Sequence, residues 1–277
     1  MEEKSMILKC EAAARQIRKD IIEMTYKTGN IGAHLGGSLS MVEILSALYV
    51  GTIDYSVAEP MWEERDRVIL SKGHAALGLY PTLVQAGILE RDMLLTFKKN
   101  GSQLSGHPSL NGLKGIEFAS GSLGQGLSQG VGVCLGLKKK NNRKSRVFVL
   151  LGDGECDEGS VWEAAASASH FGLKQLIAIV DMNKIQYDGY TKDILNMYSM
   201  PYKWKEFGWD VKEIDGHNIE ELLYTFSQPR KRPLAVIAHT IKGKGISFME
   251  GDWRYHNARL SKEQYERAMK ELEDCNV

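Results

Sequence analysis

Several features are scarce or missing in this chain of 277 residues. It has 4 cysteines and no Cys-x-x-Cys pair, so a zinc site of closely spaced thiolates is not expected. No apolar run approaches the length of a membrane span, and the N-terminus lacks the pattern of a signal peptide. The 35 basic residues balance the 35 acidic residues, so no global field favours nucleic acid or an anionic membrane. Unpaired thiols suit a reducing compartment, and we expect a cytoplasmic protein.

What the sequence does contain is a regular alternation of strand and helix patterns. Buried strands are predicted at 146–151 and 175–180, and further strands at 68–71, 209–214 and 234–238. This alternation predicts a single α/β domain over residues 1–277, with a doubly wound parallel sheet flanked by helices. Residues 100–120, rich in glycine and polar side chains, are predicted to form a long functional loop. The predicted helices are 4–27, 40–50, 75–86, 90–98, 123–139, 160–171 and 263–271.

Polar side chains follow the two central strands. The first strand ends at Gly152-Asp153-Gly154, and Asn183 follows the second. Because parallel strands end at one edge of a sheet, Asp153 and Asn183 are expected to face one crevice. Carboxylate, amide and main-chain oxygens suit a hard cation that also holds a diphosphate. A plain βα turn capped by Asp153 would explain Gly-Asp-Gly alone, and the spacing leaves the cation and the organic ligand open.

With four further segments, these residues resemble the thiamine diphosphate site of transketolases. In the chain order of that family the segments are Gly32-Ala33-His34-Leu35-Gly36-Gly37-Ser38, Ser71-Lys72-Gly73-His74-Ala75, Gly106-His107-Pro108 and Gly121-Ser122-Leu123-Gly124-Gln125-Gly126. The resemblance extends from about Ala12 to His256 and covers only the first domain of the family. It implies the N-terminal, thiamine diphosphate-binding subunit of a split transketolase. The pyrimidine-binding and C-terminal domains are then expected on a separate chain.

The resemblance assigns cofactor and metal roles to individual positions. Asp153, Asn183 and the main-chain carbonyl of Ile185 would hold Mg²⁺, with Ca²⁺ or Mn²⁺ as possible substitutes. Two diphosphate oxygens and a water would complete the octahedron. Relatives often carry proline where Ser122 stands, and this departure removes no contact group. The residues that would contact thiamine diphosphate are His74, Gly121, Ser122, Leu123, Gly154, Asn183 and His256.

The resemblance also implies catalytic roles. His34, His107 and His256 match histidines that line the sugar channel, where neutral imidazoles could bind hydroxyls and exchange protons. Glu158 matches an acid that links the two cofactor sites across the dimer. Taken alone, a loop histidine is commonly a surface residue and an acid commonly begins a helix, so family position carries these assignments. His170 and His239 are interpreted as structural, and His217 as a helix cap at most.

The expected activity is reversible transfer of a two-carbon ketol unit from a ketose phosphate to an aldose phosphate. In transketolases the glutamate that activates the cofactor lies in the second domain, so we expect activity only with a partner subunit, in an α2β2 heterotetramer. One alternative is a carboligase like deoxyxylulose phosphate synthase, against which Gly106-His107-Pro108 counts. The other is a non-catalytic cofactor-binding regulator, which would have no need of a histidine-lined channel. Which sugars serve as donor and acceptor is left open.

Overall fold

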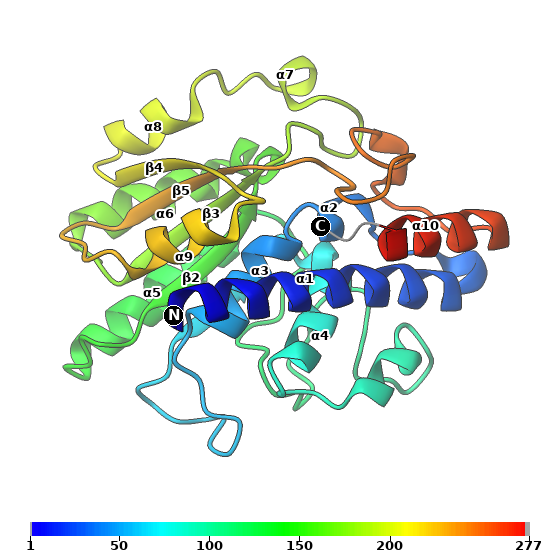
Figure 1. The fold of residues 1–277 in the computed structure, drawn as a ribbon. Coiled ribbons are helices and arrows are strands. Elements are labelled where there is room, and N and C mark those ends of the chain that lie inside the picture. The colour runs from blue at the N-terminus through cyan, green and yellow to red at the C-terminus, as the bar shows by residue number, and fades with distance from the viewer. Residues whose placement is uncertain (1, 275–277) are drawn as a thin grey trace.

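The computed structural model describes residues 2–274. Within them, parallel strands form one five-stranded sheet in the order β1-β2-β3-β5-β4 (Figure 1). Every predicted strand is confirmed to within two residues at either end, and so is the parallel, doubly wound α/β fold. The strands are β1 (Arg67–Leu70), β2 (Val147–Gly152), β3 (Leu176–Met182), β4 (Asp210–Asp215) and β5 (Leu234–His239).

The central strands are buried on both faces, because alternate side chains of a strand point to opposite sides of the sheet. Phe148 and Leu150 of β2 join one hydrophobic cluster, whereas Val147, Val149 and Leu151 join the other. These five side chains are fully buried. A continuous apolar run of this kind is what a parallel strand between two helical layers requires.

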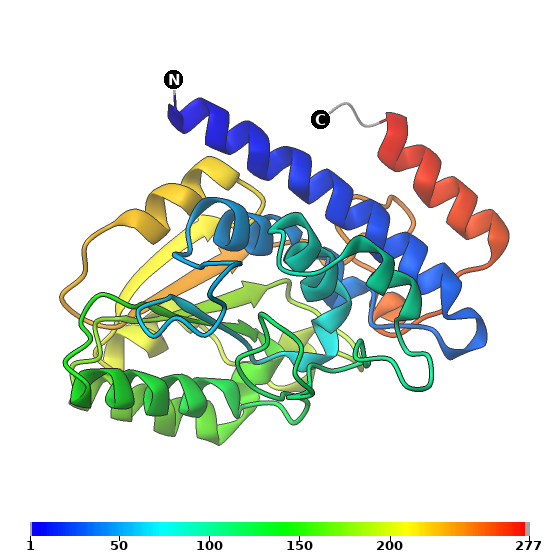
Figure 2. The same ribbon diagram turned by 90° about the horizontal axis from the view of Figure 1, so that it is seen from below.

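Helices cover both faces of the sheet (Figures 1 and 2). One layer contributes to the cluster that contains Phe148, and it includes the long α1 with α10 packed beside it. The other layer contributes to the cluster that contains Val149. The first layer consists of α1 (Glu2–Lys27), α3 (Val42–Gly51), α4 (Ala76–Gln85), α9 (Ile219–Ser227) and α10 (Lys262–Asp274), and the second of α5 (Gly126–Lys139), α6 (Gly159–His170) and α8 (Met200–Glu206).

Short helical turns lie at the ends of the strands and in the connections. They are α2 (Gly36–Leu39), α7 (Thr191–Ile194), η1 (Gly29–Ile31), η2 (Gly73–Ala75), η3 (Arg91–Thr96), η4 (Gly154–Asp157) and η5 (Trp253–Tyr255), where η denotes a 3₁₀ helix. Residues 100–125 carry no regular structure, as predicted for 100–120. No helix of the described part of the chain is both long and apolar enough to cross a bilayer.

The sequence placed some helices incorrectly. The predicted helix 90–98 is the shorter 3₁₀ helix η3, and the predicted helix 123–139 begins only at Gly126. The helix expected to start at Ser40 begins at Val42, because the Ser40 hydroxyl donates to Asp181 Oδ2 at 2.6 Å instead of capping a helix. No predicted helix range corresponds to α2, α7, α8 or α9.

Candidate functional site

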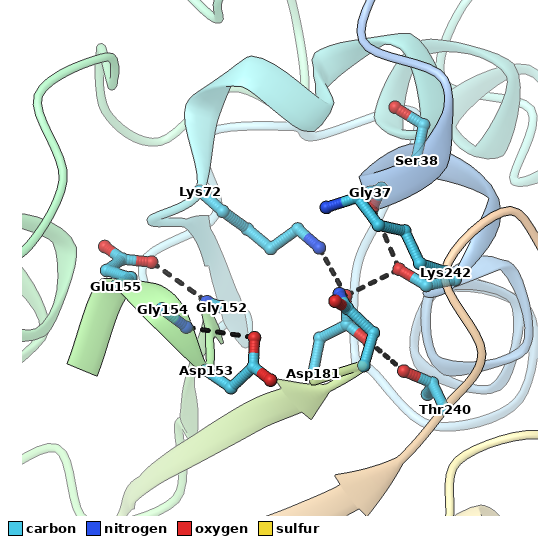
Figure 3. Close-up of polar contacts among 12 residues, drawn as sticks. Gly37, Ser38, Lys72, Gly152, Asp153, Gly154, Glu155, Asp181, Thr240 and Lys242 are labelled. Atoms are coloured by element: carbon cyan, nitrogen blue, oxygen red, sulfur yellow. Dashed lines mark hydrogen bonds and ion pairs between the residues drawn. The ribbon is translucent and has the colours of Figure 1, made fainter. Parts of the chain in front are cut away.

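Asp153 leaves β2 at the carboxyl edge of the sheet (Figure 3). Asp153 is 4% exposed, and its carboxylate accepts hydrogen bonds from the backbone N–H groups of Gly154 at 2.9 Å and Lys184 at 2.5 Å. Burial, reinforced by the negative charge of Asp181, raises the pKa of Asp153 to about 6. Since Lys184 directly follows Asn183, the structure brings the two predicted strand ends together.

Asp181, a wholly buried residue near the end of β3, organises this edge (Figure 3). Its carboxylate accepts from the Lys72 ammonium, the Thr240 hydroxyl and the Ser40 hydroxyl. It also accepts from Asn183 Nδ2 at 3.0 Å, which fixes the orientation of the Asn183 amide. Burial alone would raise the pKa of Asp181, but the Lys72 ammonium and the hydrogen bonds lower it, so the carboxylate stays charged. Asp181 was not among the predicted site residues, although a lone acid in an apolar strand is a usable signal.

The Ile185 carbonyl, a predicted metal ligand, accepts a hydrogen bond from Lys242 Nζ at 2.7 Å. Lys242 is 2% exposed, and burial together with the charge of Lys72 lowers the pKa of its ammonium to about 8. Its Nζ also lies 3.1 Å from His256 Nδ1. A carbonyl oxygen has a second lone pair, so a cation at Ile185 would have to share this oxygen with Lys242. Lys242 was not among the predicted site residues.

Four of the predicted histidines meet in one cluster, although four separate segments supply them. The ring centroid of His34 lies 5.4 Å from that of His74, 5.8 Å from that of His107 and 5.6 Å from that of His256. His74 and His256 stack at 5.1 Å. The Nδ1 atom of His34 is buried and has no hydrogen-bond partner among the residues that the structure describes. The hydrogen-bonding capacity of this ring atom is therefore unused within the described residues.

All four imidazoles of this cluster are neutral at neutral pH. Burial is the main cause, and neighbouring cations add to it: Lys98 for His34, Lys72 for His74 and Lys242 for His256. The pKa falls to about 4 for His34, about 2 for His74 and about 3 for His256, and the pKa of His107 is lowered as well. A neutral imidazole has one donor and one acceptor, so the cluster can both give and accept hydrogen bonds.

The other three histidines lie elsewhere. His217 Nδ1 lies 2.9 Å from Glu43 Oε2, and its Nε2 accepts from the Ile241 N–H at 2.9 Å. His217 caps no helix, since Asn218 is the N-cap of α9 and accepts from the Glu221 N–H. His239 lies 3.3 Å from Glu213 on the surface, and His170 is exposed at the end of α6.

Glu155 ties the predicted cofactor loop to the strand edge. Its buried carboxylate accepts from the N–H groups of Gly152 at 3.0 Å and Gly124 at 2.9 Å, and from the Ser71 hydroxyl. Gly121, Ser122 and Leu123 therefore lie in a loop anchored beside β2, where the first two residues are exposed and Leu123 is half-buried. The sequence predicted this loop but not its anchor.

Three further contacts place the remaining predicted residues. A Cβ at Gly121 would lie 3.8 Å from His107 Cδ2, so this loop borders the histidine cluster. A Cβ at Gly154 would lie 2.9 Å from Gln186 Cβ, so the close approach there requires glycine. Glu158 is exposed at the N-cap position of α6, and its side chain makes no capping hydrogen bond.

A cavity of about 360 Å³ opens next to Asp153. Asp157, Lys184 and Tyr190 contribute to its wall. Oδ1 of Asp157 is buried without a partner in the described part of the chain, whereas Oδ2 accepts from Gln186 Nε2 at 3.1 Å. The edge of the sheet therefore offers space next to Asp153 and, at Asp157, one unpaired oxygen atom.

The sequence matches the model of the family "Transketolase, thiamine diphosphate binding domain" over residues 9–273. The chain belongs to this family. The resemblance inferred from the motifs is thereby confirmed, and the chain corresponds to the N-terminal, cofactor-binding part of a transketolase.

Relatives of similar length are named as transketolase subunits. The apulose-4-phosphate transketolase subunit of Phocaeicola vulgatus is 39% identical over 95% of this chain and 94% of its own length. The 6-deoxy-6-sulfo-D-fructose transketolase subunit of a Clostridium species is 41% identical over 94% of both chains. Human transketolase is 37% identical over 94% of this chain but only 41% of its own length. The chain thus spans nearly all of the subunit relatives and about two fifths of the human enzyme.

Solved transketolases share the fold. The enzyme from Leishmania mexicana has a TM-score of 0.88 at 29% identity, covering 95% of this chain and 41% of the solved one. A Pichia stipitis transketolase in complex with sedoheptulose 7-phosphate has a TM-score of 0.88 at 28% identity, covering 96% and 41%. The fold predicted from the strand and helix alternation is therefore the fold of the first part of transketolases.

Proposed function

We propose that this chain holds the diphosphate end of thiamine diphosphate through a divalent cation and, with a partner subunit, transfers a two-carbon ketol unit from a ketose to an aldose phosphate. The observation that carries the proposal is one juxtaposition. Four neutral histidines gather beside a strand edge whose buried acid, Asp153, has no hydrogen-bonded cationic side chain among residues 2–274. A plain βα turn would not account for both features.

The residues at the strand edge fit a bound cation. The Asp153 carboxylate is buried, is held by two backbone N–H groups and carries a raised pKa of about 6, so a positive charge there would stabilise it. The Asn183 amide is oriented by Asp181, and its Oδ1 accepts one hydrogen bond, from the Ile185 N–H at 3.1 Å. Asp153, Asn183 and the Ile185 carbonyl would hold Mg²⁺, because hard oxygen donors suit this ion.

When bound, thiamine diphosphate supplies a carbanion and an electron sink for a two-carbon fragment. The chain's own residues would bind and orient its substrates. His34, His107 and His256 would hold sugar hydroxyl groups and move protons at their ring nitrogens, and His74 would contact the diphosphate. Gly121, Ser122, Leu123 and Gly154 would bring backbone close to the cofactor.

The partner is proposed to be the subunit that carries the pyrimidine-binding domain. Support comes from the subunit names of relatives of similar length and from the two fifths of the human enzyme that this chain spans. An α2β2 assembly would let Glu158 link two cofactor sites. The donor is proposed to be a ketose with an anionic end group, since one relative is named for a sugar phosphate and another for a sulfonated sugar. A cytoplasmic location also stays a prediction.

The test is turnover of the purified chain, alone and with the product of a neighbouring gene that encodes a pyrimidine-binding domain. We expect ketol transfer only from the mixture, with thiamine diphosphate and Mg²⁺. Robust turnover by the chain alone would reject the split site. Turnover with pyruvate in place of a ketose phosphate would favour the carboligase, and failure of every partner to restore turnover would favour a regulator.

A further inference from the structure

Lys98 lies between two of the loops that carry the clustered histidines. It follows η3, and its backbone N–H donates to the Leu104 carbonyl at 2.8 Å. Its φ angle is +58°, a left-handed conformation that is unfavourable for a residue with a Cβ. Neighbouring contacts must therefore hold Lys98 in place.

The side chain of Lys98 spans both loops. Its Nζ donates to the Gly32 carbonyl at 2.8 Å, two residues before His34. Its Cε passes against Gly106, where a Cβ would lie only 2.9 Å away, and Gly106 directly precedes His107. The lysine thus contacts the His107 loop with its methylene groups and the His34 segment with its ammonium group.

The His34 segment is also fixed on its other side. The backbone of Ala33 pairs with that of Ala258, with N–H to O distances of 2.9 and 3.0 Å, and Ala258 lies two residues after His256. Backbone pairing therefore joins the segments that carry His34 and His256. On the side facing His107, the Lys98 side chain connects the His107 loop to the Gly32 carbonyl of the His34 segment.

We propose that Lys98 is a positioning residue of the histidine cluster, which sets the separation of His34 and His107 so that both can contact one sugar substrate. The two ring centroids are 5.8 Å apart. The proposal rests on the proposed function, since it assigns these histidines to the sugar channel. The Lys98 ammonium is engaged with the Gly32 carbonyl, so Lys98 would affect the substrate only by positioning the His34 and His107 rings.

The charge of Lys98 has a second effect on the same histidines. After burial, Lys98 is the largest cause that lowers the pKa of His34, and it is also a cause for His107. The other titratable groups around His34 are His74, His107, His256 and Lys242. Loss of the Lys98 charge should raise the pKa of both histidines, so that they become protonated at higher pH.

Two variants separate position from charge. Lys98→Met removes the bridging contact and the charge. We expect kcat to fall about 10- to 100-fold, because small misplacements of groups that hold substrate commonly cost this much. We also expect the acid limb of the pH profile of kcat to shift to higher pH. Gly106→Ala keeps the charge of Lys98 but displaces its Cε. We expect a lower kcat without a shift in the acid limb of its pH profile. Lys98→Arg should recover most of kcat. The matched control is Lys99→Met at the adjacent, exposed lysine, which should leave kcat unchanged.

The measurements are kcat, KM and retained thiamine diphosphate for the complex with its partner, and NMR titration of the histidine rings in the full chain. Cofactor retention should stay within about twofold of wild type, because Lys98 contacts no predicted cofactor residue directly. Wild-type kcat in both Lys98→Met and Gly106→Ala would overturn the proposal, and so would parallel loss of cofactor. If the wild-type complex shows no ketol transfer, the proposed function fails, while the His34 and His107 titrations still test the role of Lys98.

Discussion

Glu155 shows how one buried side chain can hold a functional loop without touching substrate. It accepts from two backbone N–H groups and one hydroxyl, and these come from the β2 end, the 121–126 loop and the segment before His74. Burial raises its pKa, whereas these hydrogen bonds lower it. Its removal would leave several buried donors without an acceptor.

Glu155→Ala is therefore expected to destabilise the protein by about 2–4 kcal/mol, since each orphaned buried donor costs about 1–3 kcal/mol. Urea denaturation of the full chain measures the change. The control is Glu163→Ala, at an exposed position on α6, which should change stability by less than about 0.5 kcal/mol. Equal stability of the two variants would contradict the role given to Glu155.

At the residue scale, the sequence could identify groups that lie in glycine-rich turns. His74 and His107 were found in this way, and the structure places them in one cluster with His34. Asp181 and Lys242 were not predicted as site residues, because their roles depend on partners far along the chain. Asp181 meets Lys72 and Thr240 only after the sheet has formed.

At the scale of elements, the glycines of α5 differ in how much space a side chain would have at each position. Glycine in a helix commonly marks a close approach to a neighbour. A Cβ at Gly126 would overlap the Ser71 side chain, and one at Gly130 would lie 2.7 Å from Val149 Cγ2. Gly132 differs, because a Cβ there would face open space, with no atom of a described neighbour within 4 Å.

This difference yields a matched pair of substitutions on one helix. Gly126→Ala should destabilise the protein by about 1–3 kcal/mol, as overpacking against Ser71 forces the backbone or Ser71 to move. Gly132→Ala should be neutral or stabilising by up to about 1 kcal/mol, because alanine favours the helix and meets nothing. Thermal unfolding of both variants checks the prediction, and a destabilised Gly132→Ala variant together with a neutral Gly126→Ala variant would contradict it.

The helix ends were harder to predict than the strands. Serine commonly occupies the N-cap of a helix, but the Ser40 hydroxyl donates to Asp181 across the fold. Likewise, the sequence predicts an α-helix over 90–98, where the 3₁₀ helix η3 forms. Lys98, just after η3, has a left-handed φ angle that no sequence pattern indicates. In both cases tertiary contacts override a local preference.

At the scale of the whole molecule, the fold was predictable because its signal is redundant. The strand β2 is a continuous apolar run and β3 is apolar except for Asp181, and parallel neighbours separated by helices leave few possible arrangements. The same topology puts Asp153 and Asn183 at one edge. The identities of the partner, the metal and the sugar could not be predicted in this way, because they depend on groups outside this chain.

The proposed function depends most directly on Asp153 retaining the cofactor. The direct measurement is the amount of thiamine diphosphate that stays with the complex of this chain and its partner after gel filtration in Mg²⁺, for wild type, Asp153→Ala and the control Asp210→Ala. Asp210 is exposed and lies at the other end of β4 from the carboxyl edge. We predict that wild type and Asp210→Ala retain the cofactor and that Asp153→Ala loses it. Full retention by a folded Asp153→Ala complex would contradict the account.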